Sequence, residues 1–265
     1  MVIKRYFDEE GFTLYLGDCN RILKSLDDNS VDMIFADPPY FLSSGGVSCH
    51  SGKQVSVNKG DWDETMSSED ILKFNRRWLK NCRRVLKENG TIWISGTLHN
   101  IYSIGVALAS EGYSIINNIT WQKPNPSPNL ACRCFTHSTE TILWARKIDK
   151  KGKKGKKGKH YFNYSLMKEL NNGKQMKDVW LLNLPKKEEK AHGKHPTQKP
   201  LSLLERIVLA STKEGDIVLD PFNGSGTTGI ACRLLNRKYI GIDTSAAYLN
   251  VTVERYFDVK GETNE

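Results

Sequence analysis

The chain has 265 residues with 39 basic and 30 acidic side chains, which give a formal net charge of +9. A hydrophobic fraction of 38% is enough to build a substantial core and excludes a wholly disordered chain. No segment reaches the roughly 20 apolar residues that a membrane span requires, and the N-terminal residues are charged where a signal peptide is apolar. We therefore expect a soluble, cytoplasmic protein of one large domain, with no membrane partner.

Along the chain, short apolar runs alternate with helical segments. In chain order the predicted elements are a strand over 12–18, a helix around 22–26, a strand over 31–36, a helix from Ser67 ended by Gly90, a strand over 91–95, a helix over 101–111 closed by Gly112, strands over 113–123 and 140–146, a helix over 201–214, a strand over 216–220, a helix over 226–235, a strand over 238–243 and a last helix. Ser67 with Asp70 three residues later forms a capping-box start. This alternation predicts a doubly wound, mostly parallel α/β sheet.

The stretch 147–194 interrupts the alternation, so we interpret it as an inserted lobe. The chain then divides into residues 1–146 and 195–265, two halves of one domain, with 147–194 between them. Polar residues and glycines also dominate the long connection 43–66, and loops of this length are usually functional or disordered.

Positive charge is concentrated in one segment of this lobe, residues 150–159, which reads KKGKKGKKGK. It holds seven of the 39 basic residues, so the other 32 nearly balance the 30 acidic ones. Such a segment cannot be buried and its like charges repel, so we expect an exposed loop. Its side chains are candidates for contacts with a polyanion, and a solvated tether without a partner is the alternative. They are Lys150, Lys151, Lys153, Lys154, Lys156, Lys157 and Lys159.

The six cysteines are scattered, which is not the pattern of a secreted disulfide framework. Cys132 and Cys134 form the tightest pair, but no second close pair of Cys or His stands at the spacing of a zinc site. We therefore predict no metal.

A glycine-rich motif, DPFNGSGTTG over 220–229, follows the predicted strand 216–220 and opens a helix. Gly224 and Gly226 let the backbone turn tightly near a ligand, and a helix N-terminus offers N–H groups to an anion. About twenty residues later Asp243 ends the next strand, where a carboxylate can accept hydrogen bonds from a ribose. This order indicates a cofactor that contains adenosine; a purely structural turn is the alternative.

The second motif is DPPY over 37–40, at the end of the predicted strand 31–36. Pro38 and Pro39 fix the backbone and remove two N–H donors, which leaves the Asp37 carboxylate and the Pro38 carbonyl as acceptors. Two acceptors without a donor suit an exocyclic amino group, and Tyr40 offers a flat face for a base. Alone, the tetrapeptide is equally consistent with a strand-ending turn. Both motifs, however, stand at carboxyl ends of strands, where open α/β sheets bind ligands.

With DPPY ahead of the glycine-rich motif, the chain resembles the S-adenosylmethionine (SAM)-dependent amino-methyltransferases of DNA, in their permuted β group. Segments similar to the family cover nearly the whole chain: 16–19, 60–64, 95–105, 119–129, 137–147, 167–180 and 194–200. The pattern is most similar to the DpnA type of DpnII-type restriction systems, which modifies adenine in GATC. It is also similar to the cell-cycle (CcrM) and HinfI-type enzymes, which modify adenine in GANTC.

The resemblance implies a Rossmann-like methyltransferase fold, SAM as the cofactor and double-stranded DNA as the partner, with single-stranded DNA and a monomer or a homodimer left open. It implies that Asp37 and Pro38 hold the target amine and that Tyr40 stacks on the flipped base. The cofactor site would comprise Asp18 and Cys19 near its adenine, Asp243 at its ribose, Thr197 and Lys199 near its methionine end, and Asp220, Phe222, Gly224, Ser225, Gly226 and Thr227 of the glycine-rich motif. Cys19 as a buried apolar residue and Lys199 as a surface residue at a helix start are the alternatives.

To recognise a particular DNA sequence, a protein needs side chains that reach the edges of the bases. The segment 160–194 has suitable Asn, Gln and Lys residues. The connection 43–63 is the other candidate, because it follows DPPY directly. Trp62, Trp121 and Trp180 are expected in core packing rather than as wedges. By the same resemblance, Asp rather than Ser in the first position of DPPY favours methylation of adenine at N6 over methylation of cytosine at N4. The open alternatives are an N4-cytosine enzyme, an RNA or small-amine methyltransferase, and a nucleic-acid-binding module with a vestigial cofactor site.

Deletion of residues 150–159 tests the lysine-rich segment. If all seven lysines contact phosphates, the deletion should reduce the steepness of the DNA-binding salt dependence by about 6 in log–log slope, without changing the target sequence. Binding titrations between low and moderate salt measure this slope. An unchanged slope would reduce the segment to a tether.

Overall fold

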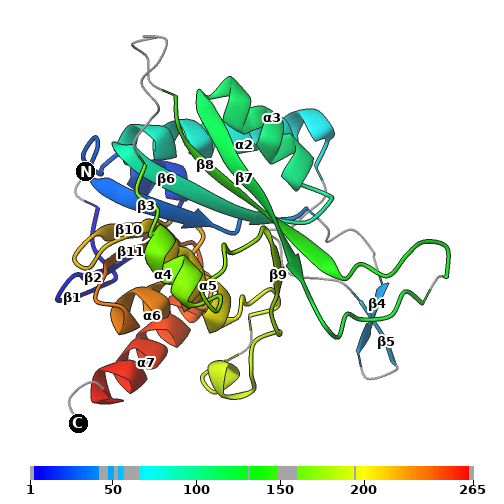
Figure 1. Cartoon of the computed structure of the whole chain (residues 1–265). Coiled ribbons are helices and arrows are strands. Elements are labelled where there is room, and N and C mark those ends of the chain that lie inside the picture. Colours follow the sequence, from blue (N-terminus) through cyan, green and yellow to red (C-terminus); the bar gives the residue numbers. More distant parts are fainter. Residues whose placement is uncertain are drawn as a thin grey trace.

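In the computed structural model, which describes residues 3–41, 47–50, 53–56, 66–130, 132–148, 160–193 and 195–262, one sheet of nine strands runs through the protein (Figure 1). Its strands, from edge to edge, are β1 (Phe7–Glu9), β2 (Phe12–Leu16), β11 (Lys238–Asp243), β10 (Ile217–Asp220), β3 (Val31–Ala36), β6 (Leu86–Gly96), β8 (Thr139–Lys147), β7 (Tyr113–Gln122) and β9 (Val179–Leu181). A separate antiparallel hairpin consists of β4 (Val47–His50) and β5 (Lys53–Ser56).

Five consecutive strands of the sheet, β2, β11, β10, β3 and β6, are parallel to one another, as predicted. Antiparallel pairs occur only toward the edges in the described part of the sheet, where β1 pairs with β2 and where β8 pairs with β6 and β7. The doubly wound, mostly parallel prediction is therefore confirmed, with an antiparallel addition at each side.

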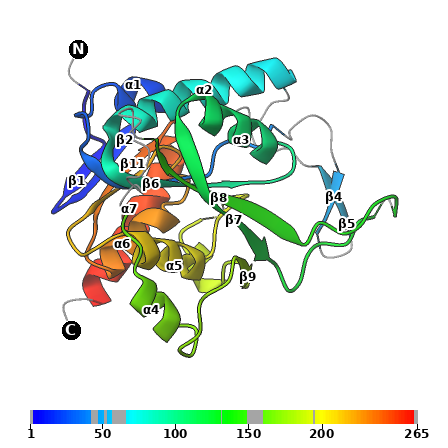
Figure 2. The same cartoon turned by 45° about the horizontal axis from the view of Figure 1, so that its top comes forward.

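Helices cover both faces of the sheet (Figures 1 and 2). One layer holds α1 (Cys19–Leu23), α2 (Ser68–Val85) and α3 (Ile101–Ser110), and the other holds α4 (Tyr164–Glu169), α5 (Leu201–Ser211), α6 (Thr227–Leu234) and α7 (Ala246–Glu262). A short 3-10 turn, Glu188–Lys190, precedes α5. Alternating side chains of β3 explain the two layers: Met33 and Phe35 pack toward α5–α7, whereas Ile34 and Ala36 pack toward α1–α3.

The start of α2 was predicted correctly, because the Ser67 side chain accepts a hydrogen bond from the Asp70 N–H at 3.1 Å. Its predicted end at Gly90 is wrong, since the backbone becomes extended at Leu86 and continues into β6. Gly90 lies inside that strand, and a Cβ there would lie 2.8 Å from the carbonyl oxygen of Asp32. Close approach of two strands, not a helix end, explains this glycine.

The predicted inserted lobe, 147–194, contributes to the main body over its described residues, which are 147–148 and 160–193. Strand β9 extends the sheet beside β7, and α4 packs against α5. Met167 and Trp180 are buried in the core on the α5–α7 face. Trp121 and Trp180 are therefore core residues, as expected, whereas Trp62, the lysine-rich segment 150–159 and most of the connection 43–63 lie outside the described residues.

Cys19, Cys82 and Cys232 are buried, and Cys132 and Cys134 are exposed. Within the ranges given above, no three His, Cys, Asp or Glu side chains gather in a way that would hold a metal ion. None of the helices in the described part of the chain combines the length and the apolar character that crossing a membrane requires.

Gly226 forms the N-terminal boundary of α6 in the left-handed conformation, with φ at +76°. A Cβ at this position would lie 2.3 Å from Thr252 Cγ2 on α7, so the glycine allows the loop to lie directly against that helix. Gly215 has nearly the same backbone conformation, with φ at +78°, but no atom lies within 4 Å of the position of its missing Cβ.

The two glycines form a matched pair for mutation. Gly215→Ala should lower the free energy of unfolding by about 1 kcal/mol through backbone strain alone. Gly226→Ala adds a steric clash in a packed core and should cost roughly 1–3 kcal/mol more. Urea unfolding followed by circular dichroism measures both, and equal losses would contradict the packing role of Gly226.

Candidate active site

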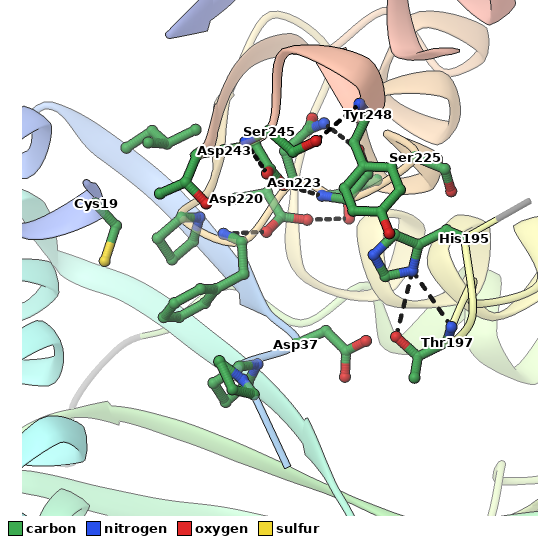
Figure 3. Close-up of a pocket in the computed structure, with 18 of the residues that line it drawn as sticks. Cys19, Asp37, His195, Thr197, Asp220, Asn223, Ser225, Asp243, Ser245 and Tyr248 are labelled. Atoms are coloured by element: carbon green, nitrogen blue, oxygen red, sulfur yellow. Dashed lines mark hydrogen bonds between the residues drawn. The ribbon is translucent and has the colours of Figure 1, made fainter. Parts of the chain in front are cut away.

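The carboxyl ends of four neighbouring parallel strands, β2, β11, β10 and β3, meet at one edge of the sheet. The loops after these strands line a pocket together with residues 195–199, which lead into α5. Figure 3 shows Cys19 on one side, His195, Thr197 and Tyr248 on the other, and Asp37, Asp220 and Asp243 between them. The two sequence motifs therefore border the same pocket.

Asp37 directly follows β3, and its carboxylate is nearly buried. Its Oδ1 accepts a hydrogen bond from the Tyr40 hydroxyl at 2.6 Å, and its Oδ2 accepts one from Lys199 Nζ at 2.5 Å. Burial raises the pKa of Asp37, and the Lys199 ammonium opposes that rise. Burial alone lowers the pKa of Lys199, but Asp37 and Glu140 together raise it above its ordinary value, so Lys199 is charged.

Tyr40 is held in the interior of the loop, with only 4% of its surface exposed. Its hydroxyl lies 2.6 Å from Asp37 Oδ1 and 3.4 Å from Glu140 Oε2. The preceding carbonyl, of Pro39, accepts a hydrogen bond from Asn100 Nδ2 at 2.8 Å, which ties the motif to the start of α3. In this arrangement the Tyr40 ring offers little open face, and its stacking on a base stays a prediction.

The glycine-rich loop is organised by two carboxylates. Asp220 accepts hydrogen bonds from the Thr228 hydroxyl at 2.6 Å and from the Phe222 N–H at 3.0 Å, which joins the end of β10 to the first turn of α6. Asp243, at the end of β11, accepts hydrogen bonds from the N–H groups of Gly224 at 2.7 Å and Ser245 at 2.8 Å. An ionised carboxylate has about four acceptor positions, so Asp243 can also accept hydrogen bonds from a ligand in the pocket.

A buried arginine supports this loop from behind. Arg255 of α7 is 7% exposed and donates to the Ser225 carbonyl at 2.7 Å and to the Thr227 hydroxyl at 3.0 Å. Asn223 lies between the loop and α7, where its Nδ2 donates to the Thr252 hydroxyl at 2.9 Å. These contacts fix the loop before any ligand is bound.

One side of the pocket is mostly apolar. Phe222 packs edge-on against Trp78, with ring centroids 5.4 Å apart, and Phe74 lies beside both Phe222 and the pocket. Cys19 lines the same side, and burial raises the pKa of its thiol to about 12. The thiol is therefore protonated and contributes packing rather than a nucleophile. Asp18 caps α1 by accepting from the Arg21 N–H at 3.0 Å.

The opposite side is built from the segment before α5. His195 Nδ1 accepts a hydrogen bond from the Thr197 N–H at 3.3 Å, and its ring meets Tyr248 edge-on with centroids 4.4 Å apart. A Cβ at Gly224 would lie 3.3 Å from His195 Nε2. The absence of a side chain at Gly224 thus keeps this part of the pocket open.

All the predicted catalytic and cofactor-site residues line the pocket except Gly226. Gly226 lies against Thr252 and has a packing role there, and its predicted place at the cofactor stays a prediction. The residues missed by the sequence reading include Phe74, His195, Gln198, Asn223, Ser245 and Tyr248 in the lining, and Glu140, Lys123 and Arg255 behind it. His195 and Gln198 belong to the segment 194–200 and were recoverable from it; Phe74 and Tyr248 look like ordinary helix residues.

Comparison with known proteins gives the family of the chain. Residues 31–254 match the model of a DNA methylase family. The chain is 58% identical over 264 residues to the type II methyltransferase M2.DpnII of Streptococcus pneumoniae, covering 100% of this chain and 96% of that protein. It is 60% identical over 255 residues to M2.LlaDCHI of Lactococcus lactis subsp. cremoris, covering 96% and 93%. Among solved structures, M1.HpyAVI in complex with SAM aligns with a TM-score of 0.65 at 29% identity, covering 92% of this chain and 98% of that one.

The chain therefore belongs to the DNA methylase family, and its class is that of SAM-dependent DNA methyltransferases. The predicted Rossmann-like fold, the SAM cofactor and the DNA partner are confirmed at this level. The roles of the individual residues stay predictions.

The pKa of Asp220 is far from its ordinary value. Its pKa is raised to about 7, chiefly by burial, although the Thr228 hydroxyl and the Phe222 N–H lower it. Asp220 therefore keeps its proton in the folded state at pH values where the unfolded chain has lost it. Its contribution to stability is complete in acid, below the pKa of about 4 that it has when unfolded, and is lost as the pH rises through about 7.

Asp220→Asn should remove this pH dependence. Relative to the unmodified protein, the variant should gain stability progressively from about pH 4 to about pH 7, by at most ~1.4 kcal/mol per pH unit, and then stay level. Urea unfolding at pH 5, 6, 7 and 8 measures the difference. Parallel stability curves for the two proteins would contradict the raised pKa.

Proposed function

We propose that this protein transfers a methyl group from SAM to N6 of an adenine flipped out of GATC in double-stranded DNA, as the modification enzyme of a restriction–modification system. The observation that carries the proposal is the position of the Asp37 carboxylate, which borders the pocket formed by the glycine-rich loop. The 58–60% identity to two type II methyltransferases, M2.DpnII and M2.LlaDCHI, supports the target and the biological context. With DNA as the substrate, we place the enzyme in the cytoplasm.

The pocket residues fit SAM. Asp243 has acceptor capacity left for ribose hydroxyls, Phe222 and Phe74 provide an apolar wall for the adenine, and the open space at Gly224 beside His195 would admit the methionine end. Thr197 lies on that same side. When bound, SAM supplies an electrophilic methyl group on its sulfonium.

The protein's part in the reaction is to prepare the amine. The lone pair of an adenine amino group is delocalised into the ring, which makes it a poor nucleophile. Asp37 and the Pro38 carbonyl would accept its two N–H groups, favour a pyramidal nitrogen and return electron density to the lone pair. No nucleophilic side chain is required, so positioning and electrostatics account for the rate.

The edge of the sheet that carries the pocket also supports contact with duplex DNA. Because β8 is antiparallel to β6, the loop 123–138 between β7 and β8 leaves the sheet at the same edge as DPPY. It projects away from the helical layers (Figures 1 and 2) and has no acidic residue. Phe135 in this loop is 96% exposed and Leu130 54%. A non-acidic loop with exposed apolar side chains suits the gap that a flipped base leaves in the stack.

Two predicted DNA-binding regions remain predictions. The seven lysines of 150–159 lie outside the described residues, as does most of the connection 43–63. The segment 160–193 is packed on the body through β9 and α4, and its exposed polar residues keep their proposed role in reading the sequence.

Methylation of unmethylated genomic DNA tests the function. After incubation with SAM, single-molecule sequencing should find N6-methyladenine at GATC. N4-methylcytosine would favour the cytosine alternative, modification of RNA alone would favour the RNA alternative, and the absence of any modified base would refute the proposal.

Asp37→Ala tests the proposed amine site. The variant should lose methylation by at least 100-fold, because one of the two acceptors for the amine is gone, while SAM binding measured by calorimetry stays within about threefold. Asp27→Ala, an exposed position away from the pocket, is the matched control and should methylate normally. Near-normal turnover by Asp37→Ala would refute this role.

A further inference from the structure

Lys199 occupies the acceptor that the proposed substrate amine needs. Its Nζ lies 2.5 Å from Asp37 Oδ2, 2.9 Å from the Tyr40 hydroxyl and 3.2 Å from the Thr197 carbonyl. An ammonium and an exocyclic amine are both N–H donors, so they compete for the same carboxylate. For the amine to take the position that Lys199 Nζ holds at Oδ2, Lys199 must move.

Lys199 cannot move away without another anionic partner. Its side chain is only 5% exposed, and a buried ammonium that loses its carboxylate costs several kcal/mol. Glu140 provides this partner, because its Oε2 lies 3.6 Å from Lys199 Nζ. A movement of roughly 1 Å would bring this contact to hydrogen-bonding distance.

Glu140 is well fixed for this purpose. It lies near the start of β8, opposite Trp121 of β7, and its side chain is 11% exposed. Its Oε1 pairs with Lys123 Nζ at 2.5 Å, and its Oε2 lies 3.5 Å from the Ser95 hydroxyl. The row Lys123, Glu140, Lys199 and Asp37 alternates in charge and sums to zero. Displacing Lys199 toward Glu140 therefore changes no net charge in the buried site.

We propose that Lys199 holds the place of the adenine amine in the free enzyme and that Glu140 is a positioning residue that receives Lys199 when the amine binds Asp37. The inference rests on the proposed function and deepens it. The exchange gives the site a preference for bases that carry an amino group, because a base must supply a hydrogen-bond donor to replace the ammonium at Asp37. It involves no covalent step.

Binding of paired duplexes tests this exchange. One duplex carries adenine at the GATC target and the other carries purine, which lacks the 6-amino group, and S-adenosylhomocysteine replaces SAM so that no methyl is transferred. The unmodified enzyme should bind the adenine duplex at least fivefold more tightly. In Glu140→Gln this ratio should fall to within twofold of unity, and kcat/KM on the adenine duplex should fall at least tenfold, while the Kd for S-adenosylhomocysteine changes less than twofold.

Two further variants complete the test. Glu140→Asp keeps the charge and should retain most of the adenine preference. Glu88→Gln is the matched control, because Glu88 also pairs with a buried lysine, Lys147 at 3.5 Å, but lies away from the pocket. This variant should change neither the Kd for the adenine duplex nor the Kd for the purine duplex by more than twofold. If Glu140→Gln weakens both duplexes equally, or if Glu140→Asp loses the adenine preference as fully as Glu140→Gln does, Glu140 is merely structural and the inference fails. A wild-type enzyme that methylates no DNA would instead refute the proposed function.

Discussion

The ion pair between Asp37 and Lys199 is the interaction on which the site depends. It joins two segments 162 residues apart in the chain, the loop after β3 and the approach to α5. A carboxylate buried at the end of a strand would otherwise take up a proton, because burial raises its pKa. The Lys199 ammonium opposes that rise and donates to the carboxylate, and Lys199 also donates to the Tyr40 hydroxyl, which sets its position.

The cofactor half of the site is built on a different principle, rigid backbone support. The loop after β10 is fixed by Asp220 and Asp243 at its front and by Arg255 behind it. Its glycines have separate tasks: Gly224 keeps space beside His195, and Gly226 lets the loop lie against α7. One half of the pocket is thus held by backbone hydrogen bonds and packing, whereas the other contains charges that can exchange partners.

Both motifs could be placed from the sequence, because each follows an apolar run that forms a parallel strand, and parallel strands deliver their loops to one edge of the sheet. The error at Gly90 arose because a glycine has more than one physical explanation. Gly90 was interpreted as a helix end but allows two strands to approach closely, whereas Gly226, predicted at the cofactor, also lets its loop pack against α7. The segment 160–193 broke the alternating pattern, yet a three-residue strand, β9, joins it to the sheet.

The residues alone therefore established the fold class, the two motifs and the chemical groups they present, because strand periodicity, proline and glycine geometry and the chemistry of carboxylates are local properties. Only the folded chain decided which charges meet. Glu140 lies near the start of β8 and Lys123 directly after β7, in segments whose similarity to the family assigned neither residue a role, and they reach the site because β8 runs antiparallel to β6 beside the DPPY loop. Partners that are distant in sequence are set by sheet order and register, which no local pattern encodes.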